Sequence, residues 1–199
     1  MNNSYEYIDP DHVYTDAKTG VLRNLGDIDD KNALSFFESA AVAKRASQLK
    51  DKPLKIKNSH SLIEIHKFLF QDVYEWAGKV RTVEISKGDK GFLPTSRFDT
   101  GFSHIDILLE EYRKLPANYK MQIAHKLAEI LDAVNFLHPF REGNGRAQRE
   151  FIRTLAIEKG IDLHLNPPDN KDVYERYMSG TINGDIKSLA DLISKLAGK

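Results

Sequence analysis

The chain has 199 residues, in which 29 Lys and Arg residues balance 29 Asp and Glu residues. This length suits a single domain with a buried core, and the balanced charge gives no overall field that would attract nucleic acid or an anionic membrane. The absence of cysteine excludes disulfides and thiolate metal sites. The N-terminal segment is polar and no apolar run approaches about 18 residues, so we expect a cytoplasmic protein with no nucleic-acid or membrane partner.

The first part of the chain predicts two helices. The segment from Lys31 to Lys50 is rich in Ala, Leu and Lys, which favour helix. A second helix is predicted from about His60 to Trp76, because apolar residues recur there at steps of three and four. Ser61 and Glu64 have the spacing of a capping box, and Gly78 is expected to end the helix.

The segment VRTVEISKGDKGFLP, residues 80–94, carries the one convincing strand signal of the chain. Its first half is rich in β-branched residues, and KGDKG supplies the residues that tight turns need. We therefore expect a short β-hairpin here.

Helical periodicity returns in the second half of the chain. A helix is predicted from Phe102 to Leu115, since Pro116 disfavours helical angles in the residue before it. The clearest helical pattern of the sequence is an apolar seam, a row of apolar residues spaced by four, three, four and three, which predicts a helix in the centre of a bundle. Its members are Ile123, Leu127, Ile130, Val134 and Leu137. Three further helices are expected over Asn144 to Lys159, Lys171 to Met178 and about Leu189 to Leu196. The predicted fold class is all-α with one hairpin.

Twelve residues, HPFREGNGRAQR from His138 to Arg149, carry most of the chemistry that the sequence offers. Pro139 disfavours helical angles at His138, so the central helix should end there and present the imidazole at the start of a loop. Histidine accepts a proton near neutral pH, and a well-placed base contributes roughly 10² to 10⁴ in rate. The alternative is that His138 only caps the helix C-terminus, where a cation is favourable.

Gly143, Asn144 and Gly145 stand where the next helix should begin. A glycine-rich turn that runs into a helix N-terminus exposes backbone N–H groups and forms an anion site. The alternative is a tight interhelical turn with no ligand.

Three arginines follow on one face of the same helix, Arg146, Arg149 and Arg153. Cations in a first turn oppose the helix dipole, which indicates that at least Arg146 and Arg149 pair with a negative group such as phosphate. The alternative is a salt bridge to a carboxylate of the protein itself.

Glu142 is a single carboxylate beside these cations. Mg²⁺ often takes one or two protein carboxylates and completes its shell with water and substrate phosphates, so a nucleotide-bound Mg²⁺ fits this position. Alternatively, Glu142 neutralises Arg141 or Arg146. Together, a base, a metal carboxylate, an anion site and phosphate-binding arginines form the set that phosphoryl or nucleotidyl transfer needs.

HPFREGNGRAQR resembles the signature of the Fic family, His-x-Phe-x-Asp/Glu-Gly-Asn-Gly-Arg-x-x-Arg, with every defining position matched. IHKFLFQDVYEWAGKVR is similar to the helix before the family's hairpin, and YTDAKTGVLRN resembles the opening of bacterial Fic toxins. The resemblance implies one Fic domain over residues 1–199, a helical bundle with its core at about 58–180, a hairpin flap at about 82–94 and the motif at 138–149.

Members of this family mostly transfer AMP from ATP to a Ser, Thr or Tyr hydroxyl of a target protein. The resemblance implies that His138 deprotonates this hydroxyl and that Glu142 holds Mg²⁺ on the α and β phosphates. It further implies that Gly143 to Gly145 cradle the phosphates, with a contribution from the Asn144 side chain. Arg146 and Arg149 would then hold the outer phosphates.

The flap of the family holds the target segment by adding it as a strand, a mode that needs only backbone groups. By resemblance, this contact is expected at Ile85, Ser86, Lys87 and Gly88; the alternative is an ordinary structural hairpin. The adenine pocket is poorly marked, and its candidates Tyr174 and Tyr177 could equally be core aromatics.

Some Fic proteins carry an inhibitory helix, Ser/Thr-x-x-x-Glu-Gly/Asn, whose glutamate pairs with the second arginine of the motif. The only Glu followed by Gly or Asn here is Glu142 itself, and SGTING, residues 179–184, has Asn183 where the glutamate should be. The resemblance therefore places this chain with Fic toxins that a separate small antitoxin restrains, and delivery into another cell as an effector stays open.

Two alternatives to AMP transfer remain. Doc-like kinases carry a lysine at the position of Gly145, so the glycine favours AMP transfer over kinase chemistry or transfer of another phosphate-linked group. A helical module that only binds nucleotide and peptide would need neither His138 as a base nor Glu142 as a metal ligand.

Overall fold

The computed structural model describes residues 5–8, 12–87 and 90–197. Its elements in this part of the chain are β1 (Tyr5–Ile8), α1 (Lys31–Asp51), α2 (Ser61–Phe70), β2 (Glu84–Lys87), β3 (Lys90–Gly91), a 3-10 turn (Thr95–Arg97), α3 (Phe98–Lys114), α4 (Lys120–Leu137), α5 (Asn144–Glu158), α6 (Lys171–Asn183) and α7 (Ile186–Ala197). The predicted all-α class with a hairpin is confirmed, because helices dominate and β2 and β3 form the hairpin.

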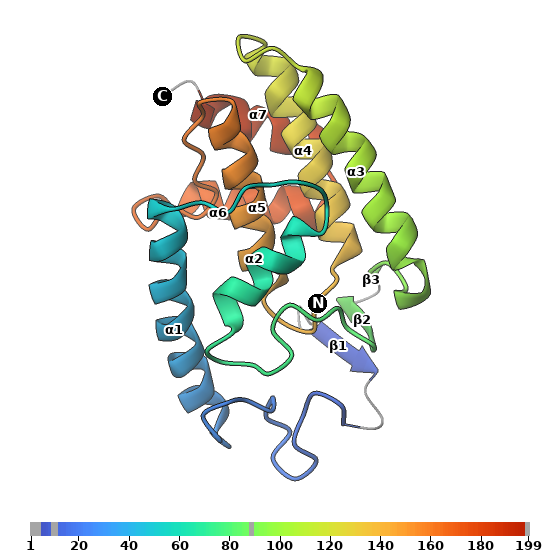
Figure 1. Ribbon diagram of the computed structural model, residues 1–199, viewed down its shortest axis with the longest axis vertical. Helices are drawn as coiled ribbons and strands as arrows, with labels where there is room; N and C mark the ends of the chain where they lie inside the picture. Colours follow the sequence, from blue (N-terminus) through green and yellow to red (C-terminus); the bar gives the residue numbers. More distant parts are fainter. Residues whose placement is uncertain (1–4, 9–11, 88–89, 198–199) are drawn as a thin grey trace.

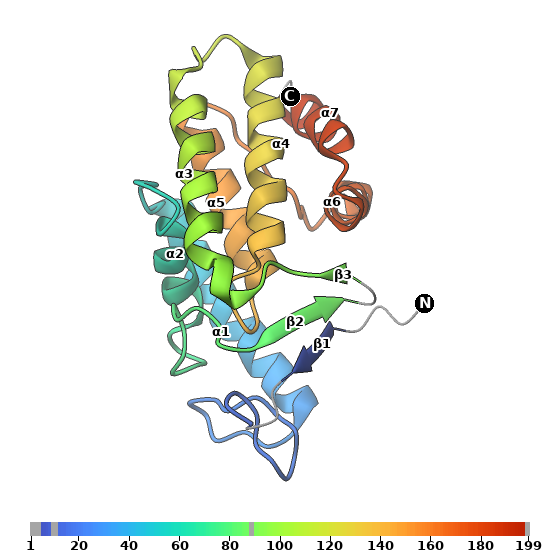
Figure 2. The ribbon, with the colours of Figure 1, turned by 90° about the vertical axis from the view of Figure 1, so that its right-hand side faces the viewer.

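Helix α4 lies at the centre of the bundle. It packs against α3, α5, α6 and α7, and α5 in turn packs against α2. Figures 1 and 2 show α3 and α4 side by side, with α6 and α7 on one flank and α1 and α2 on the other. The predicted seam explains this position, since Ile123, Leu127 and Ile130 are completely buried. Burial of such a seam is what holds an amphipathic helix in place.

The second helix is shorter than predicted. It ends at Phe70, and the residues up to Gly78 form turns in which Val73 and Tyr74 donate to the Phe70 carbonyl. The apolar spacing continues through Val73 and Trp76 because tertiary contacts bury these side chains. The periodicity therefore predicted a helix longer than the one observed. The predicted capping box is also wrong, because His60 is the N-cap and the Ser61 hydroxyl accepts from the Lys57 N–H instead.

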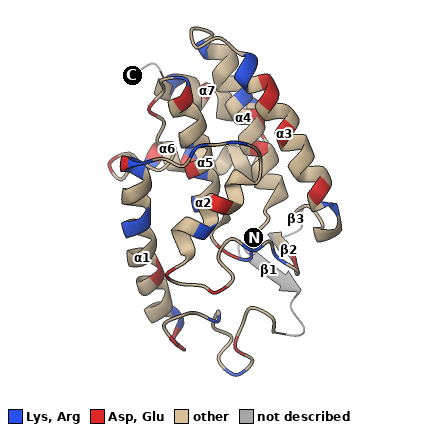
Figure 3. Cartoon of the chain, viewed as in Figure 1, with Lys and Arg blue, Asp and Glu red and all other residues tan. Residues whose placement is uncertain are grey.

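Two later helices are longer than expected. Helix α3 begins at Phe98 rather than Phe102, and α6 continues past Met178 to Asn183, where Gly184 ends it in a left-handed conformation. The part of the chain described in the structure contains no helix that is long and apolar enough to cross a membrane. Lys and Arg are interspersed with Asp and Glu over the helices, in keeping with the balanced composition (Figure 3).

The sheet has one strand more than the sequence predicted. Its order is β1-β2-β3 with both pairs antiparallel, and β2 is the central strand. Strand β1 aligns Glu6 with Ser86 and Tyr7 with Ile85. The sequence analysis did not mark this short segment as a strand, although Tyr and Ile favour strands, and the segment is held by pairing with residues far along the chain. The sheet lies beside the C-terminal end of α4, next to the motif (Figure 2).

Candidate active site

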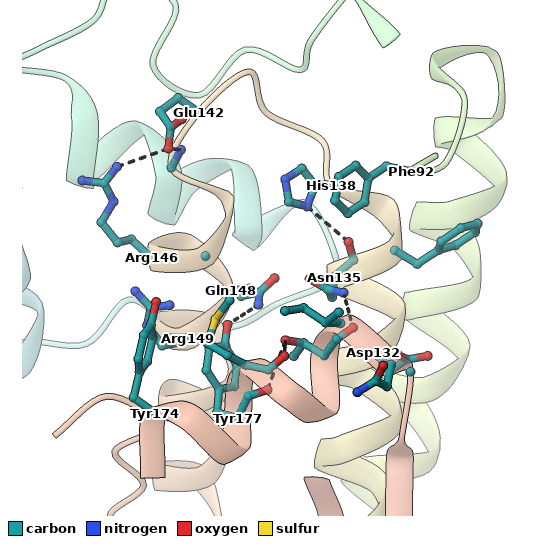
Figure 4. A pocket seen from close by; sticks show the side chains of 18 of the residues that line it. Phe92, Asp132, Asn135, His138, Glu142, Arg146, Gln148, Arg149, Tyr174 and Tyr177 are labelled. Carbon is teal, nitrogen blue, oxygen red and sulfur yellow. Dashed lines mark hydrogen bonds and ion pairs between the residues drawn. The ribbon is translucent and has the colours of Figure 1, made fainter. Parts of the chain in front are cut away.

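A cavity of about 640 Å³ opens where the C-terminus of α4, the N-terminus of α5, helix α6 and strand β3 meet. Its lining includes His138, Glu142, Gly143, Gly145, Arg146 and Arg149, six of the residues singled out in the sequence. Figure 4 shows His138, Glu142, Arg146 and Arg149 around one space, with Tyr174 and Tyr177 of α6 next to Arg149. The structure therefore gathers most of the predicted site into one cavity.

His138 is the C-cap of α4, as predicted, but its backbone is left-handed with φ 42° and ψ 58° rather than extended. Its ring is nearly buried and stacks on Phe92 with centroids 3.7 Å apart. Nδ1 lies 3.3 Å from the carbonyl oxygen of Asn135, which can only accept, so Nδ1 carries the proton of the neutral ring. The lone pair is then on Nε2, the tautomer that a general base needs.

Gly143 requires glycine for two reasons. Its φ is 83°, and a Cβ at this position would lie 2.3 Å from the ring of Phe70. Asn144 secures the same loop, since its side chain accepts from the Phe140 N–H at 2.9 Å and donates to the Phe140 carbonyl at 2.7 Å. The Asn144 side chain is buried in these contacts and does not line the cavity, which differs from the phosphate contact that the resemblance implied. Its direct effect is on loop shape.

Glu142 faces the cavity from this loop. Its Oε1 accepts from the Gly143 N–H at 2.8 Å and lies 3.5 Å from the Arg146 guanidinium. Its backbone carbonyl accepts from Nε2 of His66 at 3.0 Å. The Glu142 carboxylate is about one-third exposed and is available to a ligand in the cavity.

His66 is a buried support for the Glu142 loop that the sequence did not reveal. Its Nδ1 accepts from the Gly78 N–H at 2.9 Å, so the Nε2–H donates to Glu142. The ring stacks between Phe70 and Phe140, with centroids 4.6 and 3.7 Å away. Burial lowers the pKa of His66 to about 3, so the ring is neutral at pH 7.

The three arginines of α5 have different surroundings. Arg146 pairs with Glu38 of α1 at 2.7 Å and lies over the ring of Phe70. Arg153 pairs with Glu150 and donates to the Leu49 carbonyl. For these two, the structure bears out the alternative of a protein carboxylate.

Arg149 lies over the rings of Tyr174 and Tyr177, at 5.7 and 5.6 Å. Within residues 12–87 and 90–197, no carboxylate forms an ion pair with it. Arg149 is thus the motif cation most available to an anionic ligand.

The sequence profile of the Fic/DOC family matches residues 57–156, which include the hairpin, α4, the motif and most of α5. The chain belongs to the Fic/DOC family.

Two curated relatives and one solved structure agree with this assignment. "Protein adenylyltransferase VbhT" of Bartonella schoenbuchensis is 37% identical over 161 residues, which cover 80% of this chain and 34% of that protein. This chain thus spans about a third of the length of that relative. "Probable protein adenylyltransferase Fic" of Escherichia coli K12 is 31% identical over 179 residues, with coverage of 90% and 88%. The crystal structure of BepC from Bartonella tribocorum with bound AMPPNP superposes with a TM-score of 0.79 at 23% identity, covering 92% of this chain and 95% of that one.

The hairpin expected to be the flap places its residues differently around the cavity. Ile85 is buried and Ser86 is half-buried, and both lie on β2, which pairs with β1 on one edge and β3 on the other. The Lys87 side chain and all of Gly88 lie outside what the structure describes. Neither Ile85 nor Ser86 lines the cavity, whereas Gly91 and Phe92 do. Within the described residues, the edge of the hairpin beside the cavity belongs to β3, whereas β2 has β1 as its other neighbour.

The cavity also contains polar groups outside the Fic/DOC motif that the sequence analysis did not assign to the site. Asp132 and Asn135 come from α4, and Thr181 and Asn183 from α6. Asn135 donates to the Thr181 carbonyl, and burial raises the pKa of Asp132. Asn135 and Asp132 stand about one and two helical turns before His138, and each lies three residues from the next, a spacing that makes them neighbours along the helix and could have identified them.

Tyr177 and Tyr174 have mixed roles. Tyr177 is buried and its hydroxyl accepts from Gln148, so it is a core residue as well as a cavity wall. Tyr174 is half-buried on the same wall.

Proposed function

We propose that this Fic/DOC protein is a protein adenylyltransferase, which transfers AMP from ATP to a Ser, Thr or Tyr hydroxyl of a target protein. The observation that carries the proposal is the one cavity that His138 shares with Glu142 and the N-terminus of α5. A base, a carboxylate and an anion-binding helix end then face the same substrate.

In the proposed reaction, Nε2 of His138 removes the proton of the target hydroxyl as its oxygen attacks the α phosphorus of ATP. A new P–O bond forms to the target, the bond between the α phosphorus and the bridging oxygen breaks, and pyrophosphate leaves. The N–H groups at the start of α5 and the guanidinium of Arg149 stabilise the phosphate charge. Arg146 contributes from its place beside Glu38.

Glu142 is the residue that would hold Mg²⁺. No cluster of three or more His, Cys, Asp or Glu side chains suited to a metal occurs in the described residues, so a self-sufficient protein metal site is not available there. Glu142 is the carboxylate that lines the cavity within the motif, and one such carboxylate fits an ion whose remaining ligands are water and nucleotide phosphates. When bound, Mg²⁺ would neutralise charge on the α and β phosphates.

The nucleoside half of ATP is assigned to the end of the cavity formed by α4 and α6. The phosphates occupy the motif end, which leaves the wall of Tyr174, Met178 and Thr181 for ribose and base. Aromatic and apolar side chains supply a stacking surface there, and Asp132 and Asn135 supply hydrogen-bonding groups.

The target segment is assigned to the outer edge of β3. The Phe92 N–H donates to the Ile85 carbonyl, so the backbone of Phe92 faces β2. Backbone groups alternate along an antiparallel strand, and those of Gly91 therefore face the opposite edge. Strand addition at Gly91 would place a target hydroxyl near His138, whose ring stacks on the neighbouring Phe92.

A second cavity, of about 410 Å³, supports the proposal of a separate inhibitory partner. It lies behind the motif, between α1, α5 and the chain after α5, and its walls include small and apolar residues such as Val42, Ala46 and Leu163. Arg149 lines both cavities. A helix of a small antitoxin in this groove could direct a glutamate to Arg149 and so compete with phosphate. The role of a toxin restrained in this way, or of an effector delivered into another cell, follows from the same proposal.

The test uses ATP labelled at the α or the γ phosphate, with Mg²⁺ and a cell lysate. AMP transfer predicts that protein bands retain only the α label and that His138→Ala labels them about 10² to 10⁴ times more slowly. Retention of the γ label would indicate a kinase instead. Target binding without labelling, equal in both proteins, would favour a binding module and refute the proposal.

A further inference from the structure

Arg81 has the largest fully buried side chain in the described part of the chain, with 1% exposure. It precedes the flap, and its carboxylate neighbour Glu84 is 3.3 Å away and about half exposed. Burial lowers the pKa of the guanidinium, as expected for a cation removed from water. Such a group is costly to bury unless its donors are satisfied, so its hydrogen bonds indicate why it is there.

The Arg81 guanidinium joins three carbonyl groups that lie far apart in the sequence. Nε donates to His138 at 2.9 Å, Nη1 to Val83 at 2.6 Å and Nη2 to Leu93 at 2.7 Å. Val83 and Leu93 flank the hairpin on its two sides, and His138 is the proposed base. The Arg81 backbone N–H adds a fourth bond, to the Pro139 carbonyl at 2.7 Å. We refer to Arg81 and these carbonyls as the Arg81 clamp.

Through His138, the clamp contacts the proposed catalytic base itself. It is one of three non-glycine residues with positive φ in the described chain, and it alone of the three lines the cavity. A left-handed backbone at a residue with a Cβ is unfavourable and persists only where its surroundings enforce it. The bond from Arg81 to the His138 carbonyl acts directly on that conformation.

We propose that Arg81 is a positioning residue, which fixes His138 in its left-handed turn and holds both ends of the flap at a set distance from the imidazole. The inference rests on the proposed function, since it assigns to Arg81 the alignment of target hydroxyl and base. Phe92 also links the flap to His138, because it directly follows β3 and its ring stacks on the imidazole (Figure 4). None of the clamp hydrogen bonds goes to Gly143, Gly145 or Arg149, so we expect a change at Arg81 to affect nucleotide binding much less than AMP transfer.

Arginine is suited to this position by its shape. Its planar fork directs donors along several fixed directions, here to three carbonyls at once, and Phe98 packs against its face at 4.9 Å. Lysine retains the charge but concentrates its donors on one atom, so Arg81→Lys should lose the simultaneous bonds without removing the cation.

The experiment compares Arg81→Lys and Arg81→Met with a matched control, Arg113→Lys. Arg113 also bridges two backbone carbonyls, those of Ile56 and Lys57, at 3.1 and 2.8 Å, but it lies away from flap and motif. Three properties are measured for each: AMP transfer to lysate proteins, the Kd of AMPPNP with Mg²⁺, and the ¹³Cα chemical shift of His138, which reports its backbone angles.

We expect Arg81→Lys to lower AMP transfer about 100-fold, as misplacement of a reacting group by roughly 1 Å does, while the Kd of AMPPNP changes less than about threefold. The His138 shift should move, and Arg113→Lys should leave all three properties near wild type. Arg81→Met should behave like Arg81→Lys or fail to fold, in which case Arg81→Lys decides the outcome.

Wild-type transfer by Arg81→Lys, an equal loss of transfer and nucleotide affinity, or a slow variant with an unchanged His138 shift would each overturn the proposal. A wild-type protein that transfers no AMP would instead refute the proposed function, and the His138 shift would still test the clamp.

Discussion

The motif loop and the flap face the same cavity but are held in different ways. The loop is held by buried contacts: the Asn144 side chain hydrogen-bonds to the backbone of Phe140, and Gly143 packs against the ring of Phe70. The flap is a short hairpin held by backbone pairing with β1 and by Arg81. A rigid loop is suited to a constant ligand such as a nucleotide. A hairpin edge that offers backbone groups is suited to targets of varied sequence.

Between the motif loop and the edge of the flap, the loop is expected to be the more sensitive to substitution, and Gly143→Ala tests it. The new Cβ would meet the Phe70 ring at 2.3 Å at a φ of 83°, so the loop and the first N–H groups of α5 must shift. We expect AMP transfer to fall about 100-fold. Gly160→Ala is the control, because its φ is 74° but nothing lies within 4 Å of the added atom. Similar activity losses in both variants would show that backbone strain, and not the Phe70 contact, is responsible.

A smaller effect is expected on the flap, from Gly91→Pro. Proline removes the N–H that faces the outer edge of β3, and the loss of one hydrogen bond should slow labelling of target proteins about tenfold. The Kd of AMPPNP should not change. Ser86→Ala serves as the comparison, since it alters a side chain on β2 but no backbone donor, and it should label at the wild-type rate. If Ser86→Ala were slower than Gly91→Pro, side chains of the flap would be selecting the target.

His66 beneath the motif loop is expected to affect stability rather than AMP transfer, through a pH dependence. The folded chain holds the pKa of His66 at about 3, against about 6.5 when unfolded. Between these values the unfolded chain binds more protons, so the free energy of unfolding decreases as the pH falls from about 6.5 toward 3. The slope from this group is at most about 1.4 kcal/mol per pH unit.

Denaturant unfolding from pH 7 to 4 without added metal measures this slope. His66→Gln keeps a polar side chain but does not titrate, so its stability at pH 7 is lower and its decline with acid is shallower than that of the wild type. Parallel pH curves for the two proteins would contradict the assignment of a neutral, buried His66.

The helices and the motif could be predicted because both are encoded locally. A helix is held by bonds between residues four apart, so the seam from Ile123 to Leu137 identified α4 and its buried face. Local patterns failed where distant contacts decide, as in the turns between Phe70 and Gly78 or the pairing of β1 with β2.

The sequence by itself determined the fold class through helical periodicity and the family through the twelve positions of the motif, and it singled out six of the residues that line the cavity. Only the tertiary structure decided how those residues are held and which of them are available. Glu38 pairs with Arg146 while Arg149 lacks a carboxylate among the described residues, and Arg81 reaches the His138 carbonyl from 57 positions away. The physical reason is that a buried charge or donor takes whichever acceptor the packed core brings within hydrogen-bond distance, and sequence spacing does not record that proximity.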